Sequence, residues 1–190
     1  MSALLLAAIL TIVAAPPVWA AGPWKGQVVD ADTAKPLPDV IVFAVWWKRF
    51  PTPALIHEGR AFHRAVEVVT DTEGTFKIPA VSTFTLNPLA RIEGPDLTVF
   101  RAGYGRWRFR DQPASMYELT DAWLDDVWKR FVREGVVIEL PPLTDVDERL
   151  LANELMSPPY GQIPGSEGVR LRQALRADWD ELARRKSGRR

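Results

Sequence analysis

The sequence predicts a mainly β fold, an antiparallel β-sandwich that carries one inserted helix and further helices at its C-terminal end. Short apolar runs separated by turn-forming residues recur through the first half of the chain, which is typical of a sandwich. One of these runs, Asp39–Trp47, is apolar on both of its alternating faces, so we expect a second layer to cover its outer face. Helical spacing appears only after residue 115.

The first 20 residues are interpreted as a secretory signal peptide. They carry no charge, the run Ala3–Ala15 is apolar apart from Thr11, and Val18-Trp19-Ala20 offers the small residues that a signal peptidase recognises. A membrane anchor is the alternative, but a spanning helix needs about 20 apolar residues. We therefore expect an exported protein, periplasmic or extracellular.

The strands are expected in order along the chain. They are 27–30, 39–47, 62–70, 75–79, 97–101 and 136–140, and either 83–86 or 106–109 is a candidate for a further strand. In the third of these strands Phe62, Val66 and Val68 are placed on one face, and His63 and Glu67 on the other. Asp71–Gly74 is predicted to join strands 62–70 and 75–79 as a hairpin turn. Calcium binding by this turn is disfavoured because so short a loop supplies few oxygens.

Three helices are predicted in the second half. Ser115 and Glu118 have the spacing of a capping box, and the helix that they open runs to a glycine C-cap at Gly135. This insert, at about 115–134, is the candidate to cover the outer face of strand 39–47.

The two later helices form a C-terminal extension, 144–190. Thr144 or Asp145 is expected to cap a helix that ends at Leu155 and buries Val146, Leu150, Leu151 and Leu155. The last helix is expected at about 167–185, capped by Gly165–Gly168, with a packing stripe of Leu171, Leu175, Trp179 and Leu182.

Three segments resemble carboxypeptidase regulatory-like domains, which belong to the transthyretin-like (prealbumin-like) group. They are Gly26–Val40, the run Thr70–Pro79 that is similar to the family's TDxxGxFxIP pattern, and Phe100–Tyr104 with its Gly-Tyr pair. The resemblance implies a Greek-key sandwich over 21–143 and a non-catalytic accessory or interaction role. Ala34 and Asp39 stand where the family usually has glycine, so the first turn must be built without glycine.

The charge balance restricts the partners. Lys plus Arg and Asp plus Glu number 24 each, so no global field favours nucleic acid, and we expect no nucleic-acid partner. The last seven residues, 184–190, contain five basic side chains, which are either a solvated terminus or a contact for anionic lipid or cell-wall polymer. Membrane contact is therefore expected only through this tail. No cysteine is present to form disulfides.

No catalytic, cofactor or metal site is predicted. A zinc carboxypeptidase needs His-x-x-Glu, but Arg60 follows His57 at that spacing and Val66 follows His63. The two Tyr and two His of an intradiol dioxygenase are matched in number, yet both histidines precede Tyr104, Tyr117 and Tyr160, against that family's order. His57 and His63, with Glu58 or Glu67, remain an open alternative as metal ligands and hence as a metal-dependent hydrolase.

The eight tryptophans are the other unusual feature. Trp46, Trp47, Trp107, Trp123 and Trp128 serve either as core or as a platform for sugar rings. The predicted function is therefore a non-catalytic exported accessory or interaction protein that binds an envelope protein, and the alternative is a carbohydrate or cell-wall binding module.

Overall fold

The computed structural model describes residues 20–52, 58–113, 115 and 118–188. Apart from the backbone of Ala20, the expected signal segment 1–20 lies outside this part of the chain. Within the part that is described, no helix is long and apolar enough to cross a bilayer.

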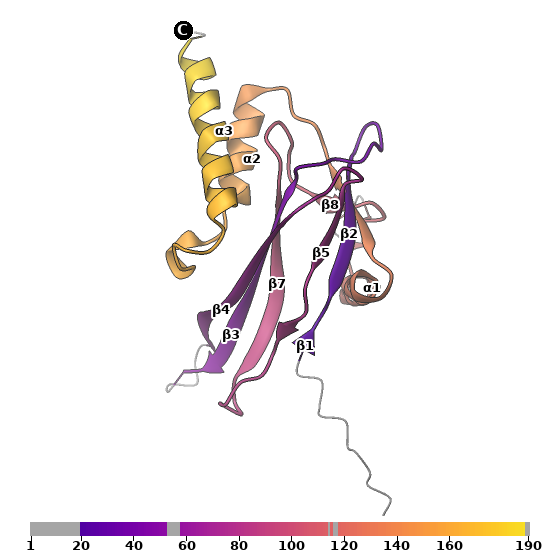
Figure 1. The fold of residues 1–190 in the computed structure, drawn as a ribbon, viewed down its shortest axis with the longest axis vertical. Coiled ribbons are helices and arrows are strands. Elements are labelled where there is room, and N and C mark those ends of the chain that lie inside the picture. Colours follow the sequence, from indigo (N-terminus) through magenta and orange to yellow (C-terminus); the bar gives the residue numbers. More distant parts are fainter. Residues whose placement is uncertain (1–19, 53–57, 114, 116–117, 189–190) are drawn as a thin grey trace, which may run out of the picture.

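Strand is more abundant than helix, and most of it lies in two sheets (Figure 1). The three-stranded sheet has the order β4 (Glu58–Val69), β3 (Ile41–Pro51), β7 (Arg91–Phe100). The four-stranded sheet has the order β5 (Thr75–Ile78), β2 (Trp24–Asp30), β9 (Val136–Leu140), β8 (Arg108–Phe109). A short ladder pairs β1 (Ala20–Ala21) with β6 (Val81–Ser82). Of the two candidates for a further strand, 106–109 contributes β8, whereas 83–86 is a loop.

The sheets are not wholly antiparallel, as the sequence had suggested. β2 and β9 are parallel, with Gly26 opposite Val136 and Asp30 opposite Leu140. Parallel neighbours cannot be joined by a tight turn and need a long connection. Here most of the described chain, including α1 (Asp121–Arg133), separates the two strands, and local turn residues carry no information about their direction.

The turn at Asp71–Gly74 is present, but it does not close a hairpin. Its geometry is as expected: Gly74 has a φ of 68°, and the Asp71 amide donates to the Thr75 carbonyl at 3.0 Å. However, β4 belongs to the three-stranded sheet and β5 pairs with β2 in the other. The turn therefore carries the chain from one sheet to the other, because the same turn chemistry serves both kinds of connection.

The two apolar faces of β3 are buried in two different cores, which confirms the expected second layer. The residues Val40, Val42, Ala44 and Trp46 join side chains of the four-stranded sheet, such as Val28 and Ile138, in the core that the two sheets share. Phe43, Val45 and Trp47 lie on the opposite face in a second core with Phe100, Met156 and Leu171.

The helix predicted to cover the outer face of β3 was the wrong one. α1 packs on the four-stranded sheet, where Val127 and Phe131 enter the shared core. The outer face is covered instead by α2 (Val146–Met156) and α3 (Val169–Ser187), which lie on the other side of the molecule (Figure 1). α1 joins β8 to β9, two neighbours in one sheet, and a short connection keeps it beside that sheet.

A bulge in β4 overturns the predicted placement of Phe62. Trp46 pairs with Arg64, but Trp47 pairs with Phe62, so His63 is an extra residue in the ladder. One extra residue moves everything beyond it to the opposite face. Val66 and Val68 accordingly pack on the shared core, whereas Phe62 packs on the second core with its ring 6.4 Å from that of Trp47.

The helix starts differ in part from expectation. Asp145 caps α2 as predicted, since its carboxylate accepts from the Asp147 and Glu148 amides. The capping box at Ser115 is wrong, because α1 begins after Thr120, whose hydroxyl accepts from the Trp123 amide at 3.2 Å. Gly135 follows α1 with a φ of 97°, as a helix-ending glycine does.

The start of α3 is stabilised from a distant strand. Its N-cap is Gly168, within the loop 165–168 that was expected to cap the helix, but no side chain caps it from there. The carboxylate of Glu67 on β4 accepts instead from the amides of Leu171 at 2.8 Å and Arg170 at 3.2 Å. Gly168 has a φ of 62°, and a Cβ there would lie 2.9 Å from the Phe43 ring.

The apolar stripes of α2 and α3 are only partly buried. Leu171, Leu175 and Leu182 are buried as predicted, but Trp179 is 44% exposed and Asp178 is buried in its place. Asp178 accepts from Asn153 at 3.1 Å and pairs with Arg149 at 2.5 Å, so α2 and α3 are joined by a polar network. α2 turns Arg149 and Asn153 towards α3. Leu151 and Leu155 are therefore 57% and 67% exposed, although the sequence predicted that they are buried.

Candidate functional site

The histidine hypothesis receives little support from the described residues. His57 lies outside them, and the ring nitrogen Nε2 of His63 is 2.9 Å from the Ser82 carbonyl oxygen. Both carboxylates considered as partners are engaged elsewhere: Glu67 caps α3, and Glu58 pairs with Arg91 at 2.7 Å. In the part of the chain that is described, no group of three His, Cys, Asp or Glu side chains is placed to hold a metal ion.

The tyrosines of the dioxygenase comparison occupy separate environments. Tyr117 lies outside the described residues. The Tyr104 hydroxyl donates to Asp30 at 3.2 Å, while Tyr160 packs on the second core. The Tyr160 hydroxyl is buried without a hydrogen-bond partner among the residues that the structure describes, and burial raises the pKa of this side chain to about 12.

The segments that resemble regulatory-like domains in sequence form interlocked turns. The Asp30 carboxylate accepts from the Thr33 amide at 2.8 Å, from the Thr33 hydroxyl and from the Asp32 amide, and these hydrogen bonds hold its pKa below the usual range. The Tyr104 hydroxyl of the Gly-Tyr pair reaches the same carboxylate. Asp71 accepts likewise from the amide and hydroxyl of Thr75, which hold its pKa low. These carboxylates stabilise turns and are ionised, so they are poor general acids at neutral pH.

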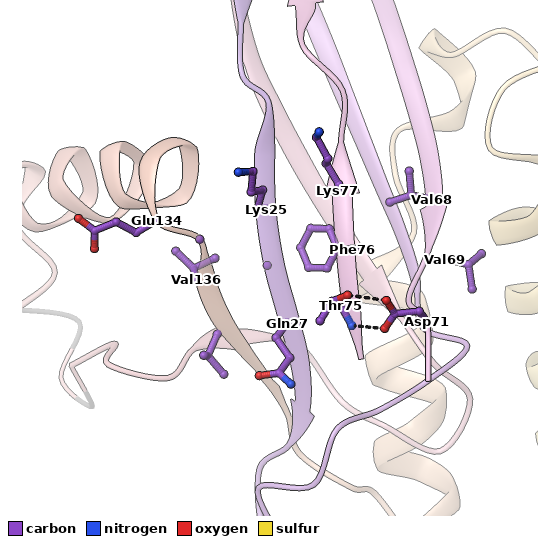
Figure 2. Close-up of a pocket in the computed structure, with 13 residues that line it drawn as sticks. Lys25, Gln27, Val68, Val69, Asp71, Thr75, Phe76, Lys77, Glu134 and Val136 are labelled. Carbon is purple, nitrogen blue, oxygen red and sulfur yellow. Dashed lines mark hydrogen bonds between the residues drawn. The ribbon is translucent and has the colours of Figure 1, made fainter. Parts of the chain in front are cut away.

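A shallow hollow of about 840 Å³ lies along β2 and β5 and reaches the edge of β4 (Figure 2). Lys25 and Lys77 are directly opposite each other in the antiparallel ladder and point the same way. Neither lysine forms an ion pair with any described residue. The Thr75 hydroxyl in the hollow donates to Asp71, and hydrogen bonds hold the pKa of this carboxylate low, which makes it a weak base, so the described lining suits electrostatic contact better than catalysis.

A second hollow, which we name the aromatic groove, is the stronger candidate for ligand binding. It encloses about 530 Å³ between β7, β8, α1 and the end of α2. Its lining is mostly apolar and aromatic, with a few polar groups, as in most small-molecule sites. The lining residues are Leu97, Thr98, Arg106, Trp107, Phe109, Gln112, Leu119, Trp123, Leu124, Trp128, Leu155, Met156 and Ser157.

The buried ring of Phe109 organises the groove. The rings of Trp107, Trp123 and Trp128 lie 5.2, 6.1 and 6.2 Å from it, all edge to face. Aromatic pairs prefer this arrangement to direct face-to-face stacking. The three tryptophans are thus held in fixed orientations while each stays half-buried at the groove wall.

The polar groups of the groove suit binding better than catalysis. The Trp107 indole N–H donates to the Leu97 carbonyl at 3.4 Å, whereas the indole N–H groups of Trp123 and Trp128 have no partner among the described residues. Ser157, the one hydroxyl from α2's end, already donates to the Asn153 carbonyl. The lining residues that the structure describes include no His, Cys, Asp or Glu, so they offer donors and aromatic faces but no acid or base.

The structure separates the five tryptophans considered as a sugar platform. Trp46 and Trp47 are fully buried in the two cores, whereas Trp107, Trp123 and Trp128 meet in the groove. Sequence reasoning missed Phe109, Gln112 and Leu155 as groove residues. The helical spacing of Leu119, Trp123 and Leu124 was visible in the sequence, but it had been assigned to packing on β3.

Comparison with protein-family models, with curated proteins and with solved structures finds no match to this chain.

Proposed function

We propose that this chain is a non-catalytic accessory or interaction protein of the cell envelope, exported by its N-terminal segment and built on a transthyretin-like Greek-key sandwich of the carboxypeptidase regulatory-like kind. Two features support the fold assignment: two sheets share one core, and the motif carboxylates Asp30 and Asp71 stabilise turns. The observation that carries the function is the aromatic groove, which presents half-buried indoles without an acid or a base.

The test compares two leucines of α2 that differ in one respect. Leu155 lines the groove, whereas Leu151, one turn earlier and similarly exposed, does not. Wild-type protein, Leu155→Ser and Leu151→Ser serve as baits for envelope extracts. Binding that is lost with Leu155→Ser and kept with Leu151→Ser supports the proposal, and binding that is indifferent to Leu155 contradicts it.

A carbohydrate or cell-wall polymer is the second candidate for the occupant. The unpartnered indole N–H groups of Trp123 and Trp128, with Arg106 and Gln112 on the rim, favour it, because sugars combine an apolar ring face with hydroxyls. Titration with peptidoglycan fragments is expected to shift the indole N–H resonances of these two tryptophans and not that of Trp46. Trp107→Ala is expected to weaken binding. A glycan array without any signal would remove this candidate.

A further inference from the structure

The loop between β6 and β7 is the most apolar exposed segment of the described chain. Residues 83–90, which we name the apolar loop, contain no charged side chain. Three of its large side chains face solvent: Leu86 is 89% exposed, Leu89 is 71% exposed and Phe84 is 51% exposed. Single exposed leucines are ordinary on a soluble protein, but three on one uncharged loop mark a contact surface.

The apolar loop lies beside the point where the N-terminal segment joins the fold. Ala20 is paired with Ser82, only two residues before Phe84. The chain that precedes Ala20 contains the apolar run Ala3–Ala15. β1 and the start of β7 lie at one end of the molecule, and the C-terminal end of α3 lies at the other (Figure 1).

Four of the seven backbone amides of the apolar loop have a hydrogen-bond acceptor close by in the chain. The amides of Phe84, Asn87, Leu89 and Ala90 donate to Ser82, Thr85 and Asn87, and Pro88 has no amide to satisfy. An unsatisfied amide is costly to remove from water, so this pattern lowers the cost of placing the loop in an apolar medium.

The charges beside the loop are paired with one another. Arg91 forms ion pairs with Glu58 and Glu93, and Glu93 also pairs with Arg49. This end of the molecule therefore presents a compensated rim around an uncharged apolar tip, so no excess of negative charge repels an anionic surface.

We propose that the apolar loop inserts into the interfacial region of a lipid bilayer and holds the protein against the membrane by its β1 end. The occupant is lipid because the loop is uncharged, the charges that flank it are paired with one another, and the chain that carries the apolar run Ala3–Ala15 joins the fold at Ala20, opposite Ser82. The proposal is independent of the aromatic groove. It differs from contact through the basic tail 184–190, whose described part, 184–188, lies at the opposite end.

The absence of cysteine from the sequence allows a single fluorescent label to test this. Leu86→Cys and Ser187→Cys, each in the full chain, are labelled with an environment-sensitive dye and mixed with vesicles of phosphatidylethanolamine and phosphatidylglycerol. The label at Leu86 is expected to shift to the blue and to be quenched by spin-labelled acyl chains, while the label at Ser187 stays in water. Because the label reports its own depth, tethering by the N-terminal segment alone gives no signal at Leu86.

A second substitution tests the apolar contact itself. Adding Leu89→Asp to the Leu86→Cys chain is expected to reduce the inserted fraction by about tenfold or more, given the transfer free energy of one leucine. Leu151→Asp on α2, at a similarly exposed leucine, is the control and is expected to change nothing. No response at Leu86, a response at Ser187 of the same size, or insensitivity to Leu89→Asp would each overturn the proposal.

Discussion

Two residues in the turns that precede β3 adopt a conformation that normally selects glycine. Ala34 and Asp39 both have a φ of 58°, at the two positions where regulatory-like domains usually carry glycine. The left-handed region costs an L-residue about 1–2 kcal/mol. The turn at Ala34 thus keeps its conformation although its sequence does not favour it. The hydrogen bonds that Asp30 accepts from Asp32 and Thr33 help to hold this turn in place.

Replacing Ala34 by glycine should therefore stabilise the protein. Relief of the strain outweighs the added flexibility of the unfolded chain, and we expect the free energy of unfolding to rise by about 0.5–1 kcal/mol. Urea denaturation measures this change in the free energy of unfolding. Ala102→Gly, at an exposed alanine without a positive φ, is the control and should lower stability slightly. Destabilisation by Ala34→Gly as large as that of the control would contradict the strain argument.

The raised pKa of Tyr160 leads us to expect that the free energy of unfolding falls at alkaline pH. Its pKa is about 12 in the folded protein because of burial and about 10 when unfolded, so unfolding releases a proton between these values. Its contribution is complete below pH 10 and is lost as the pH rises towards 12. Ultraviolet titration should show one phenol ionising near pH 12.

The same residue gives a neutral-pH test. Tyr160→Phe removes a buried hydroxyl that has no partner in the described part of the chain, and it should stabilise the protein by up to about 1 kcal/mol at pH 7. The substitution should also abolish the late phenol ionisation. A marked loss of stability at pH 7 would mean that the hydroxyl is hydrogen-bonded.

At the scale of elements, the start of α3 depends on a strand about a hundred positions earlier. We expect Glu67→Ala to lower the free energy of unfolding by about 1–2 kcal/mol, because the amides of Arg170 and Leu171 lose their acceptor at the positive end of the helix dipole. Glu154→Ala, at an exposed carboxylate of α2, should cost less than about 0.5 kcal/mol. Thermal unfolding of both variants measures the two losses of stability. An equal loss in Glu67→Ala and Glu154→Ala would contradict the capping role of Glu67.

At the scale of the molecule, the C-terminal extension completes the fold and is more than an appendage. Deleting 144–190 would expose Phe43, Val45, Trp47 and Phe100, each of which contributes about 1.5–3 kcal/mol by its burial. Their sum is comparable with a typical total stability of about 5–15 kcal/mol. We expect the shortened chain to aggregate on expression, whereas deletion of 186–190 alone removes one exposed ion pair and should leave stability unchanged. A soluble, cooperatively unfolding chain ending at Leu143 would contradict this expectation.

The aromatic groove could be predicted only in part, because the sequence shows which residues are aromatic but not where each one packs. Trp107, Trp123 and Trp128 were singled out because large aromatic residues are rare and conspicuous, and all three line the groove. Trp46 and Trp47 were equally conspicuous but are buried in different cores. The apolar run that forms β3 indicates that both faces of this strand are buried, but it does not indicate which elements cover each face.

The sequence by itself determined the local features of this protein: the short strands, the two apolar faces of β3, the Asp71–Gly74 turn, and a cap of α2 at Thr144 or Asp145. All of these depend on residues close together in the chain. Only the tertiary structure decided that β2 and β9 are parallel, that α2 and α3 cover β3, and that Glu67 caps α3. It also decided that three tryptophans meet around Phe109. Such contacts join residues that are far apart in sequence, and no local periodicity or turn signal encodes which distant partner a surface will meet.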